Sequence, residues 1–268
     1  MSFSINISVF GSARRIVLIS ALVFVAISCT SLEEPVKTPA NRNVNYSGSD
    51  GTPLSGYLAK PSGEGPLPAV MMIHEWWGLN EDVTILADAL AKEGFLVLAP
   101  DALRGELATT VPAAIALNSR TPKERIASDL DGALEFLKTH PDVDASRVAT
   151  MGFCFGGRES MRLGIRAEGL SAVITLYGSG LVTNADELGN LATNGPVLGI
   201  FGEKDSSIPL RDVESFSDAL HDIGADSTIT VYPEMGHAFV KSSTYRDEGA
   251  AGQAWDELIG FLKRHLLL

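Results

Sequence analysis

Short, largely apolar runs alternate with longer segments of helical periodicity along most of this chain. The apolar runs occupy positions 69–73, 95–99, 148–151, 172–176, 197–201 and 228–232. Continuous apolar runs of this length are typical of strands buried on both faces of a sheet. Helices are predicted between and after them, at 80–94, 121–140, 158–166, 210–223 and 250–265. This alternation predicts an α/β fold with a mostly parallel central sheet and helices on both faces.

Two further strands are expected before the first buried run. Residues 44–46 and 54–59 flank the turn sequence at 49–53, a pattern that predicts an antiparallel hairpin. Asn80 is a candidate N-cap for the first helix. The Ala-rich segment 105–120 shows no clear strand pattern, and the sequence does not predict its conformation.

The composition excludes several classes of partner. The 268 residues are 45% hydrophobic and carry a formal net charge of −12, without a basic run. A nucleic acid is therefore not an expected partner, and an electrostatic attachment to anionic lipid is disfavoured, because the overall field repels phosphates. Two cysteines, Cys29 and Cys154, make at most one disulfide, so the chain is not a disulfide scaffold.

The first 28 residues have the pattern of an export signal. Arg14 and Arg15 precede an apolar run at 16–27, which has signal-peptide length and is too short to span a bilayer comfortably. Small residues before Cys29 resemble a lipoprotein signal, in which cleavage precedes the cysteine and the cysteine is then acylated. Cleavage by an ordinary signal peptidase, suggested by Ala26, and an uncleaved anchor are the alternatives.

This signal sets the predicted domain organisation. Residues 1–28 are the signal peptide, residues 29–42 form a tether with prolines and no periodicity, and residues 43–268 form the folded domain. The protein is expected to be exported, either to a bacterial periplasm or as a membrane-anchored lipoprotein held only through Cys29. Acylation of Cys29 would leave Cys154 as the one remaining thiol.

Cys154 lies at the centre of the sequence Gly152-Phe-Cys-Phe-Gly156, between a predicted strand and a predicted helix. A nucleophile on such a sharp turn has a strained backbone, and side chains at the flanking glycines would collide with neighbouring backbone. The helix amino terminus carries partial positive charge and free N–H groups, which favour a reactive thiol. The alternative is a buried structural cysteine in a Gly-rich turn.

Two further residues with catalytic chemistry follow later strands. Asp205 comes after the run at 197–201, and His237 follows the run at 228–232. The order nucleophile, acid, histidine is the chain order of α/β-hydrolases, and sites in open parallel sheets lie beyond the carboxyl ends of the strands. In this arrangement His237 would take the proton of Cys154, and Asp205 would orient the imidazole.

Each of these residues has a simpler alternative. His237 could be a surface loop residue, and Asp205 competes with Glu203 and with a role in the turn alone. His74, beside Glu75, is more consistent with a packed histidine than with a metal ligand, because no second ligand lies at helical spacing. No metal and no organic cofactor are expected.

Several of these motifs together resemble the dienelactone hydrolase family from about residue 45 onward. They are Glu75, Gly-Phe-Cys-Phe-Gly-Gly at 152–157, Gly-Glu-Lys-Asp at 202–205 and Gly-His-Ala-Phe at 236–239. Cysteine at the nucleophile position distinguishes this family from most α/β-hydrolases, which carry serine there. The resemblance therefore implies an α/β-hydrolase fold with a Cys154, Asp205 and His237 triad.

The resemblance also implies roles for other residues. Glu75 is similar to a family glutamate that contacts the nucleophile and helps to set its protonation. The family's oxyanion hole corresponds to the backbone N–H groups of Trp76 and Phe155. Two basic side chains bind the substrate carboxylate in the family, and the matching positions are Arg104 and Lys241. Lysine replaces the usual arginine at 241, and it lacks the planar fork that binds a carboxylate bidentately.

The function predicted from the sequence is hydrolysis of a small-molecule ester or lactone through an acyl-enzyme on Cys154. The carboxymethylenebutenolidase reaction of the family is the nearest specific activity implied. The alternatives are a thioester or amide hydrolase on the same fold and a non-catalytic binding protein of the cell envelope. A complete triad disfavours the last of these, since binding alone does not need one.

Overall fold

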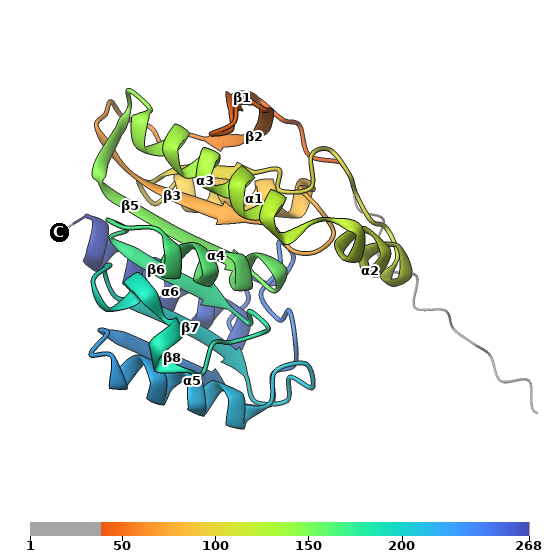
Figure 1. Cartoon of the computed structure of the whole chain (residues 1–268), viewed down its shortest axis with the longest axis vertical. Helices are drawn as coiled ribbons and strands as arrows, with labels where there is room; N and C mark the ends of the chain where they lie inside the picture. The colour runs from red at the N-terminus through yellow and green to blue at the C-terminus, as the bar shows by residue number, and fades with distance from the viewer. Residues whose placement is uncertain (1–38, 268) are drawn as a thin grey trace, which may run out of the picture. The chain divides into compact units, whose positions relative to one another are not determined.

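Eight strands form one sheet in the order β1-β2-β4-β3-β5-β6-β7-β8 in the computed structural model, which describes residues 39–267 (Figure 1). The strands are β1 (Val44–Ser47), β2 (Pro53–Ala59), β3 (Leu67–Ile73), β4 (Leu96–Pro100), β5 (Val143–Phe153), β6 (Ala172–Leu176), β7 (Val197–Gly202) and β8 (Ser227–Tyr232). Strands β3 to β8 are parallel, while β1 and β2 form the predicted antiparallel hairpin. The predicted fold class is confirmed.

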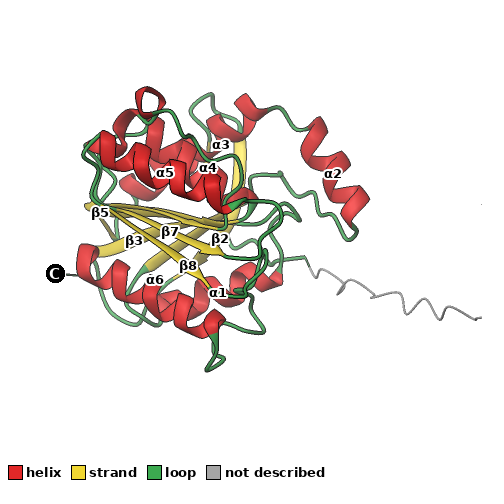
Figure 2. Ribbon diagram, turned by 90° about the horizontal axis from the view of Figure 1, so that it is seen from below, coloured by secondary structure: helices red, strands yellow, loops and turns green. Residues whose placement is uncertain are grey.

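Helices cover both faces of this sheet, with α1 and α6 on one side and α3, α4 and α5 on the other (Figure 2). The α-helices are α1 (Glu81–Ala91), α2 (Val111–Arg120), α3 (Lys123–Thr139), α4 (Phe155–Arg166), α5 (Leu210–Asp222) and α6 (Ala250–Leu266). Two short 3₁₀ helices, Ala185–Glu187 and Gly189–Ala192, precede β7. None of the helices in residues 39–267 is both long and apolar enough to cross a membrane.

The continuous apolar runs follow from burial of the strands on both faces. In β3, Val70 and Met72 pack into the core under α1 and α6. The alternating residues Ala69, Met71 and Ile73 pack into the core under α3 and α4. All five are fully buried. A strand whose side chains enter two cores cannot alternate apolar and polar residues, which explains why the sequence pattern is unbroken.

Helix α2 occupies the segment whose conformation the sequence did not predict. Its N-cap is Thr110, whose hydroxyl accepts a hydrogen bond from the Ala113 N–H at 3.4 Å. Ala114 and Leu117 are its buried residues, and they pack in a small cluster with Trp77. The helix has so few buried positions that its apolar periodicity is weak.

The folded part begins before the predicted boundary at residue 43. Pro39 forms a β-bridge with the N-cap residue of α1, and Ala40 is 7% exposed in the core. The Arg42 Nε donates to Asp101 Oδ2 at 2.5 Å. Residues 39–42, predicted as the end of the tether, therefore pack against the domain. The predicted signal peptide, Cys29 and the rest of the tether lie outside the described residues.

Candidate active site

Cys154 occupies a sharp turn between β5 and α4. The strand ends one residue before it, the helix begins one residue after it, and Cys154 itself has φ 53° and ψ −111°. A Cβ on Gly152 would lie 2.3 Å from the Gly156 backbone, and a Cβ on Gly156 would lie 2.1 Å from the Ile73 carbonyl oxygen. The steric reason predicted for the two flanking glycines is confirmed, since only glycine lets these backbones approach so closely.

Backbone strain gathers at the carboxyl edge of the sheet. The non-glycine residues with positive φ in the described part of the chain are Arg104, Cys154, Tyr177, Glu234 and Ala238. They follow β4, β5, β6 and β8, so all lie in connections that leave the carboxyl ends of strands. Such conformations cost about 1–3 kcal/mol each and cluster at functional sites. Their distribution indicates that this edge carries the site.

His237 and Asp205 form a hydrogen-bonded pair at this edge. The distance from His237 Nδ1 to Asp205 Oδ2 is 2.6 Å, and the Asp205 side chain is fully buried. Asp205 Oδ1 accepts the Ser207 N–H at 2.8 Å, which fixes the carboxylate plane. Because an ionised carboxylate can only accept, Nδ1 carries the proton, and Nε2 of the neutral ring is free to accept another.

Main-chain contacts between the turns after β7 and β8 place this pair. The Lys204 N–H donates to the Met235 carbonyl at 2.8 Å, and the Glu203 N–H donates to the Tyr232 carbonyl at 3.0 Å. A Cβ on Gly202 would lie 2.4 Å from the Met235 carbonyl oxygen, so glycine is needed where the turns meet. The two turns are thus joined as one unit.

Glu203, the alternative to Asp205, does not contact the imidazole. Its Oε2 accepts the Glu234 N–H at 2.9 Å, and the residue is exposed. Its carboxylate therefore supports the joined turns from the solvent side. The structure brings Asp205, and not Glu203, to His237.

The environment of Cys154 keeps its thiol protonated. Burial is the largest cause that raises the thiol pKa, to about 12, and the negative charge of Glu75 is the second. The Phe155 N–H and the Arg158 guanidinium act in the opposite direction but are outweighed. The N–H at the helix terminus acts on the thiol pKa in the expected direction, but desolvation and a nearby carboxylate outweigh it in this structure.

Tyr177, the residue directly after β6, connects the thiol with the histidine loop, and the sequence motifs do not identify it. Its ring centroid is 5.4 Å from that of His237 in an edge-on contact, and its hydroxyl donates to the Val240 carbonyl at 2.8 Å. It also interacts electrostatically with Cys154. No hydrogen bond joins Cys154 Sγ to the His237 ring in the described structure, as is common in catalytic sites without substrate.

His74 is a packed histidine that supports the Glu75 loop. It is fully buried, its Nε2 accepts the Ala102 N–H at 3.2 Å, and its Nδ1 lies 2.6 Å from the Glu75 carbonyl oxygen. Since Nε2 accepts, Nδ1 carries the proton and donates. Burial lowers the pKa of His74, which favours this neutral form. Residues 39–267 contain no group of three or more His, Cys, Asp or Glu side chains placed to hold a metal.

Trp76 and Trp77 follow Glu75 in the chain and pack in a cluster with the buried residues of α2. The two rings contact edge-on at 5.3 Å. Asn118 of α2 donates from Nδ2 to the Trp76 carbonyl at 2.9 Å. The Trp76 N–H makes no hydrogen bond to any described acceptor. Helix α2 therefore fixes the backbone of the predicted oxyanion-hole residue from outside the sheet.

The two predicted carboxylate-binding residues have different surroundings. Arg104 grips Asp129 of α3 with two hydrogen bonds, from Nε at 2.8 Å and from an Nη atom at 2.7 Å. The guanidinium is therefore occupied, and a substrate carboxylate would have to compete with Asp129. Lys241 is exposed in the loop after His237, where its backbone N–H and carbonyl both bond to Thr244.

Comparison with known proteins assigns the chain to a family. The sequence profile of the dienelactone hydrolase family matches residues 54–266. A Yersinia pestis protein named "Putative carboxymethylenebutenolidase" is 31% identical over 232 residues, which cover 81% of this chain and 86% of that protein. A protein of the same name from Methylorubrum extorquens is 28% identical over 274 residues, covering 94% of this chain and 93% of that protein.

Solved structures show the same relationship. A Klebsiella pneumoniae protein named "Putative Dienelactone Hydrolase" superimposes with a TM-score of 0.70 at 30% identity, covering 84% of this chain and all of that one. A dienelactone hydrolase-like promiscuous phosphotriesterase from metagenomic libraries has a TM-score of 0.71 at 23% identity, over 85% and 99% of the two chains, and shares the fold. The resemblance inferred from the motifs is confirmed: the chain belongs to the dienelactone hydrolase family and is an ester hydrolase.

Proposed function

We propose that this enzyme cleaves a small ester or lactone through an acyl-enzyme on Cys154. The observation that carries the proposal is the geometry of the sheet edge: a strained cysteine between β5 and α4 beside a preformed Asp205–His237 pair. The relatives named for carboxymethylenebutenolidase activity support a lactone substrate. In this assignment Cys154 is the nucleophile, His237 the general base and acid, and Asp205 the residue that orients the imidazole.

The first half of the reaction transfers the acyl group to sulfur. His237 Nε2 takes the thiol proton while Sγ attacks the carbonyl carbon of the substrate. The carbonyl oxygen becomes an oxyanion, which accepts hydrogen bonds from the N–H groups of Trp76 and Phe155. Collapse of this tetrahedral intermediate breaks the carbon–oxygen ester bond, and the His237 imidazolium gives the proton to the departing alkoxide. For a lactone, this alcohol stays attached to the acyl group.

The second half repeats these proton transfers with water. His237 takes a proton from a water molecule while the water oxygen attacks the thioester carbonyl carbon. Collapse of this second tetrahedral intermediate releases a carboxylic acid. The sulfur leaves as a thiolate and recovers the proton from the imidazolium. Asp205 is buried beside the ring, so it stabilises the imidazolium in both halves.

The high thiol pKa fits this sequence of steps. A thiol with a pKa of about 12 is unreactive until a base removes its proton in the transition state, but the sulfur that results is a stronger nucleophile than a thiolate of low pKa. The resting protein is thereby protected from stray electrophiles. Deprotonation is coupled to a bound carbonyl, whose oxyanion the two N–H groups stabilise.

Steady-state kinetics on p-nitrophenyl acetate and on a small unsaturated lactone test the assignment. Cys154→Ala and His237→Ala should each lower kcat by about 10⁴-fold or more. His221→Ala, in the last turn of α5, is a matched control and should retain full activity. Undiminished turnover in either site variant would overturn the proposal. Rapid quenching followed by mass spectrometry should show the acyl group on Cys154.

The same substrate panel separates esters from thioesters and amides. An enzyme built for esters and lactones should turn over an acetyl ester and the lactone with higher kcat/KM than an acetyl thioester or anilide of the same acyl group. A preference for the thioester would assign the alternative reaction on the same residues.

We also propose that the protein is exported and anchored through an acylated Cys29, with the Arg14, Arg15 and apolar 16–27 pattern as support. Intact-mass measurement of protein from the membrane fraction should give an amino terminus at Cys29 with added acyl chains. Cys29→Ala should move the protein out of the membrane fraction. An amino terminus upstream of Cys29 would contradict the lipoprotein assignment.

A further inference from the structure

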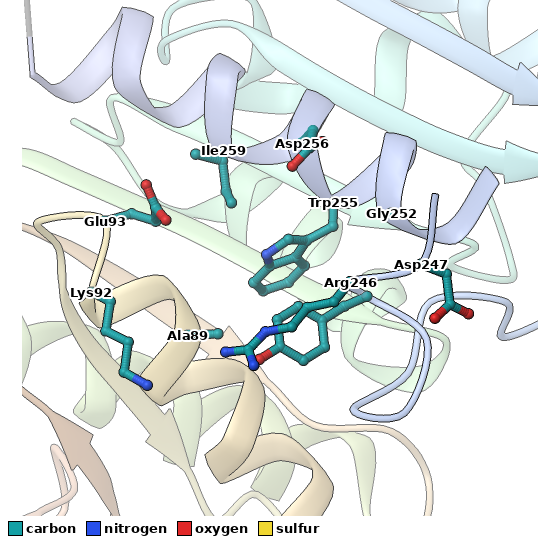
Figure 3. Close-up of a pocket in the computed structure, with 10 residues that line it drawn as sticks. Ala89, Lys92, Glu93, Arg246, Asp247, Gly252, Trp255, Asp256 and Ile259 are labelled. Carbon is teal, nitrogen blue, oxygen red and sulfur yellow. The ribbon is translucent and has the colours of Figure 1, made fainter. Parts of the chain in front are cut away.

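A cavity lies away from the thiol, between the carboxyl end of α1 and the first half of α6 (Figure 3). Its volume is about 330 Å³, within the range of small-molecule sites. The lining residues are Ala89, Lys92, Glu93, Tyr245, Arg246, Asp247, Gly252, Trp255, Asp256 and Ile259. None of them belongs to the candidate active site, so a ligand here would be distinct from the substrate.

The floor of the cavity is aromatic and carries two hydrogen-bond donors without partners. Trp255 is 3% exposed and Tyr245 is 8% exposed, and their rings contact edge-on at 5.4 Å. Neither the indole N–H nor the phenol hydroxyl bonds to a described residue, and neither is among the polar atoms sealed from solvent. Both atoms therefore retain some exposure to solvent. Because both residues line the cavity, these donors are available to an acceptor that binds there.

Two positively charged side chains, Lys92 and Arg246, also line the cavity. In the view of Figure 3 both side chains are drawn below the Trp255 ring. Neither forms an ion pair with any residue in the described part of the chain, and the Arg246 guanidinium lies 4.9 Å over the Tyr245 ring. Glu93 does not neutralise them, because Lys263 Nζ holds its carboxylate at 2.6 Å.

The remaining charges limit the kind of anion. Asp247 and Asp256 line other parts of the wall and lie apart from the two cations in Figure 3. They would repel a second negative charge on the ligand, so a singly charged group is favoured over a doubly charged phosphate. Ile259 and Ala89 give the wall an apolar part beside the indole. The ligand should therefore combine one anionic group with an apolar body.

We propose that this cavity binds a small organic carboxylate, with the carboxylate between Lys92 and Arg246 and the apolar body on Trp255 and Ile259. The carboxylate oxygens accept charge-assisted hydrogen bonds from the two cations. An aromatic or branched aliphatic body fills the space between α1 and α6 and replaces water on the indole face.

Indole ¹⁵N–¹H spectra of the full chain test this assignment, because the three tryptophans divide between the two sites. Trp76 and Trp77 report on the candidate active site, and Trp255 reports on the cavity. Titration with benzoate should shift the Trp255 signal saturably, with single Trp→Phe variants used to assign the three signals. Benzamide, which has the same shape without the charge, should leave the Trp255 signal in place over the same concentrations.

Charge-removing variants complete the test. Lys92→Gln and Arg246→Gln are exposed changes, and each should raise the apparent Kd for benzoate about tenfold, as expected for loss of one charge-assisted hydrogen bond. Arg211→Gln, an equally exposed change on α5, should leave the Kd unchanged. An unmoved Trp255 signal, an equal response to benzamide, or an unchanged Kd in the Lys92→Gln and Arg246→Gln double variant would overturn the proposal.

Discussion

The two halves of the candidate triad differ in how far they are assembled before substrate arrives. The Asp205–His237 half is complete: the carboxylate is buried, its second oxygen is tied to the Ser207 N–H, and the imidazole bond is 2.6 Å long. The Cys154 half is not yet in its reactive form: burial and the charge of Glu75 raise the thiol pKa to about 12, so the thiol is protonated. In the proposed mechanism the base is therefore already positioned, whereas the thiol of the proposed nucleophile is still protonated.

This difference separates two ways of making a reactive cysteine. A low-pKa thiol is ionised at rest and is exposed to oxidation and alkylation. A high-pKa thiol beside a prepared base ionises only when a carbonyl can take up the charge. The second design suits a compartment that contains oxidants. The predictions below test each half, from the largest expected effect to the smallest.

Asp205→Asn should lower kcat on p-nitrophenyl acetate by about 10⁴-fold, because the amide stabilises the wrong imidazole tautomer and cannot balance the imidazolium. The variant should keep its fold, since Asn is nearly isosteric. Glu203→Gln retains an acceptor for the Glu234 N–H and should keep wild-type kcat. Loss of activity in Glu203→Gln with retention in Asp205→Asn would reverse the assignment of the acid.

The pH dependence of Cys154 alkylation by iodoacetamide should report the raised thiol pKa directly. With a pKa of about 12, about one thiol in 10⁴ is ionised at pH 8, so labelling of Cys154 should rise about tenfold per pH unit between pH 7 and 11. The raised pKa favours the protonated form, so acid slows labelling and alkali accelerates it. A plateau reached below pH 8 would show an ionised thiol and would contradict the comparison.

Glu75→Gln should increase the rate at which the Cys154 thiol is alkylated. Removing the negative charge lowers the Cys154 pKa, and a fall of one unit gives about tenfold faster labelling at pH 8. Glu81→Gln, an exposed change in the first turn of α1, is the control and should label like the wild type. Equal labelling rates in Glu75→Gln and the wild type would remove Glu75 as a cause.

Tyr177→Phe should make the position of the loop that carries His237 less well defined. It removes the bond from the Tyr177 hydroxyl to the Val240 carbonyl, which leaves a buried acceptor unpaired and should cost about 1–3 kcal/mol of unfolding free energy. We expect a fall in kcat of about tenfold, with KM little changed, because the histidine loop is less well placed. Urea unfolding and steady-state kinetics measure both quantities. Unchanged kcat would show that Tyr177 serves stability alone.

Arg158→Gln should have the smallest effect. The guanidinium lowers the thiol pKa, so its loss should raise that pKa and slow labelling about threefold at pH 8. The effect is small because Arg158 is also paired with Glu159 and is partly exposed. Faster labelling in Arg158→Gln would contradict the sign of this interaction.

The sequence predicted the order and faces of the elements because both depend on local pattern. The runs at 69–73 and 172–176 could be read as buried strands, and the glycines around Cys154 predicted the turn that the structure contains. Position after a strand was also enough to bring Asp205 and His237 together as candidates, since parallel strands end at one edge.

The parts that could not be predicted depend on contacts between distant segments. Helix α2 is fixed by packing on Trp77 and by the Asn118 bond to the loop after β3, and neither contact leaves a periodic pattern. The engagement of Arg104 by Asp129 joins residues 25 positions apart. The thiol pKa is set by burial and by Glu75, which a strand-turn-helix motif does not reveal.

The main-chain bonds between the turns after β7 and β8 have a consequence for variation among sequences. Peptide groups hold these turns together, so the side chains at 203 and 204 can change without separating the carboxylate from the ring. Those exposed positions are therefore suitable for randomisation in directed evolution. Gly202 is the residue that must stay fixed in such a library.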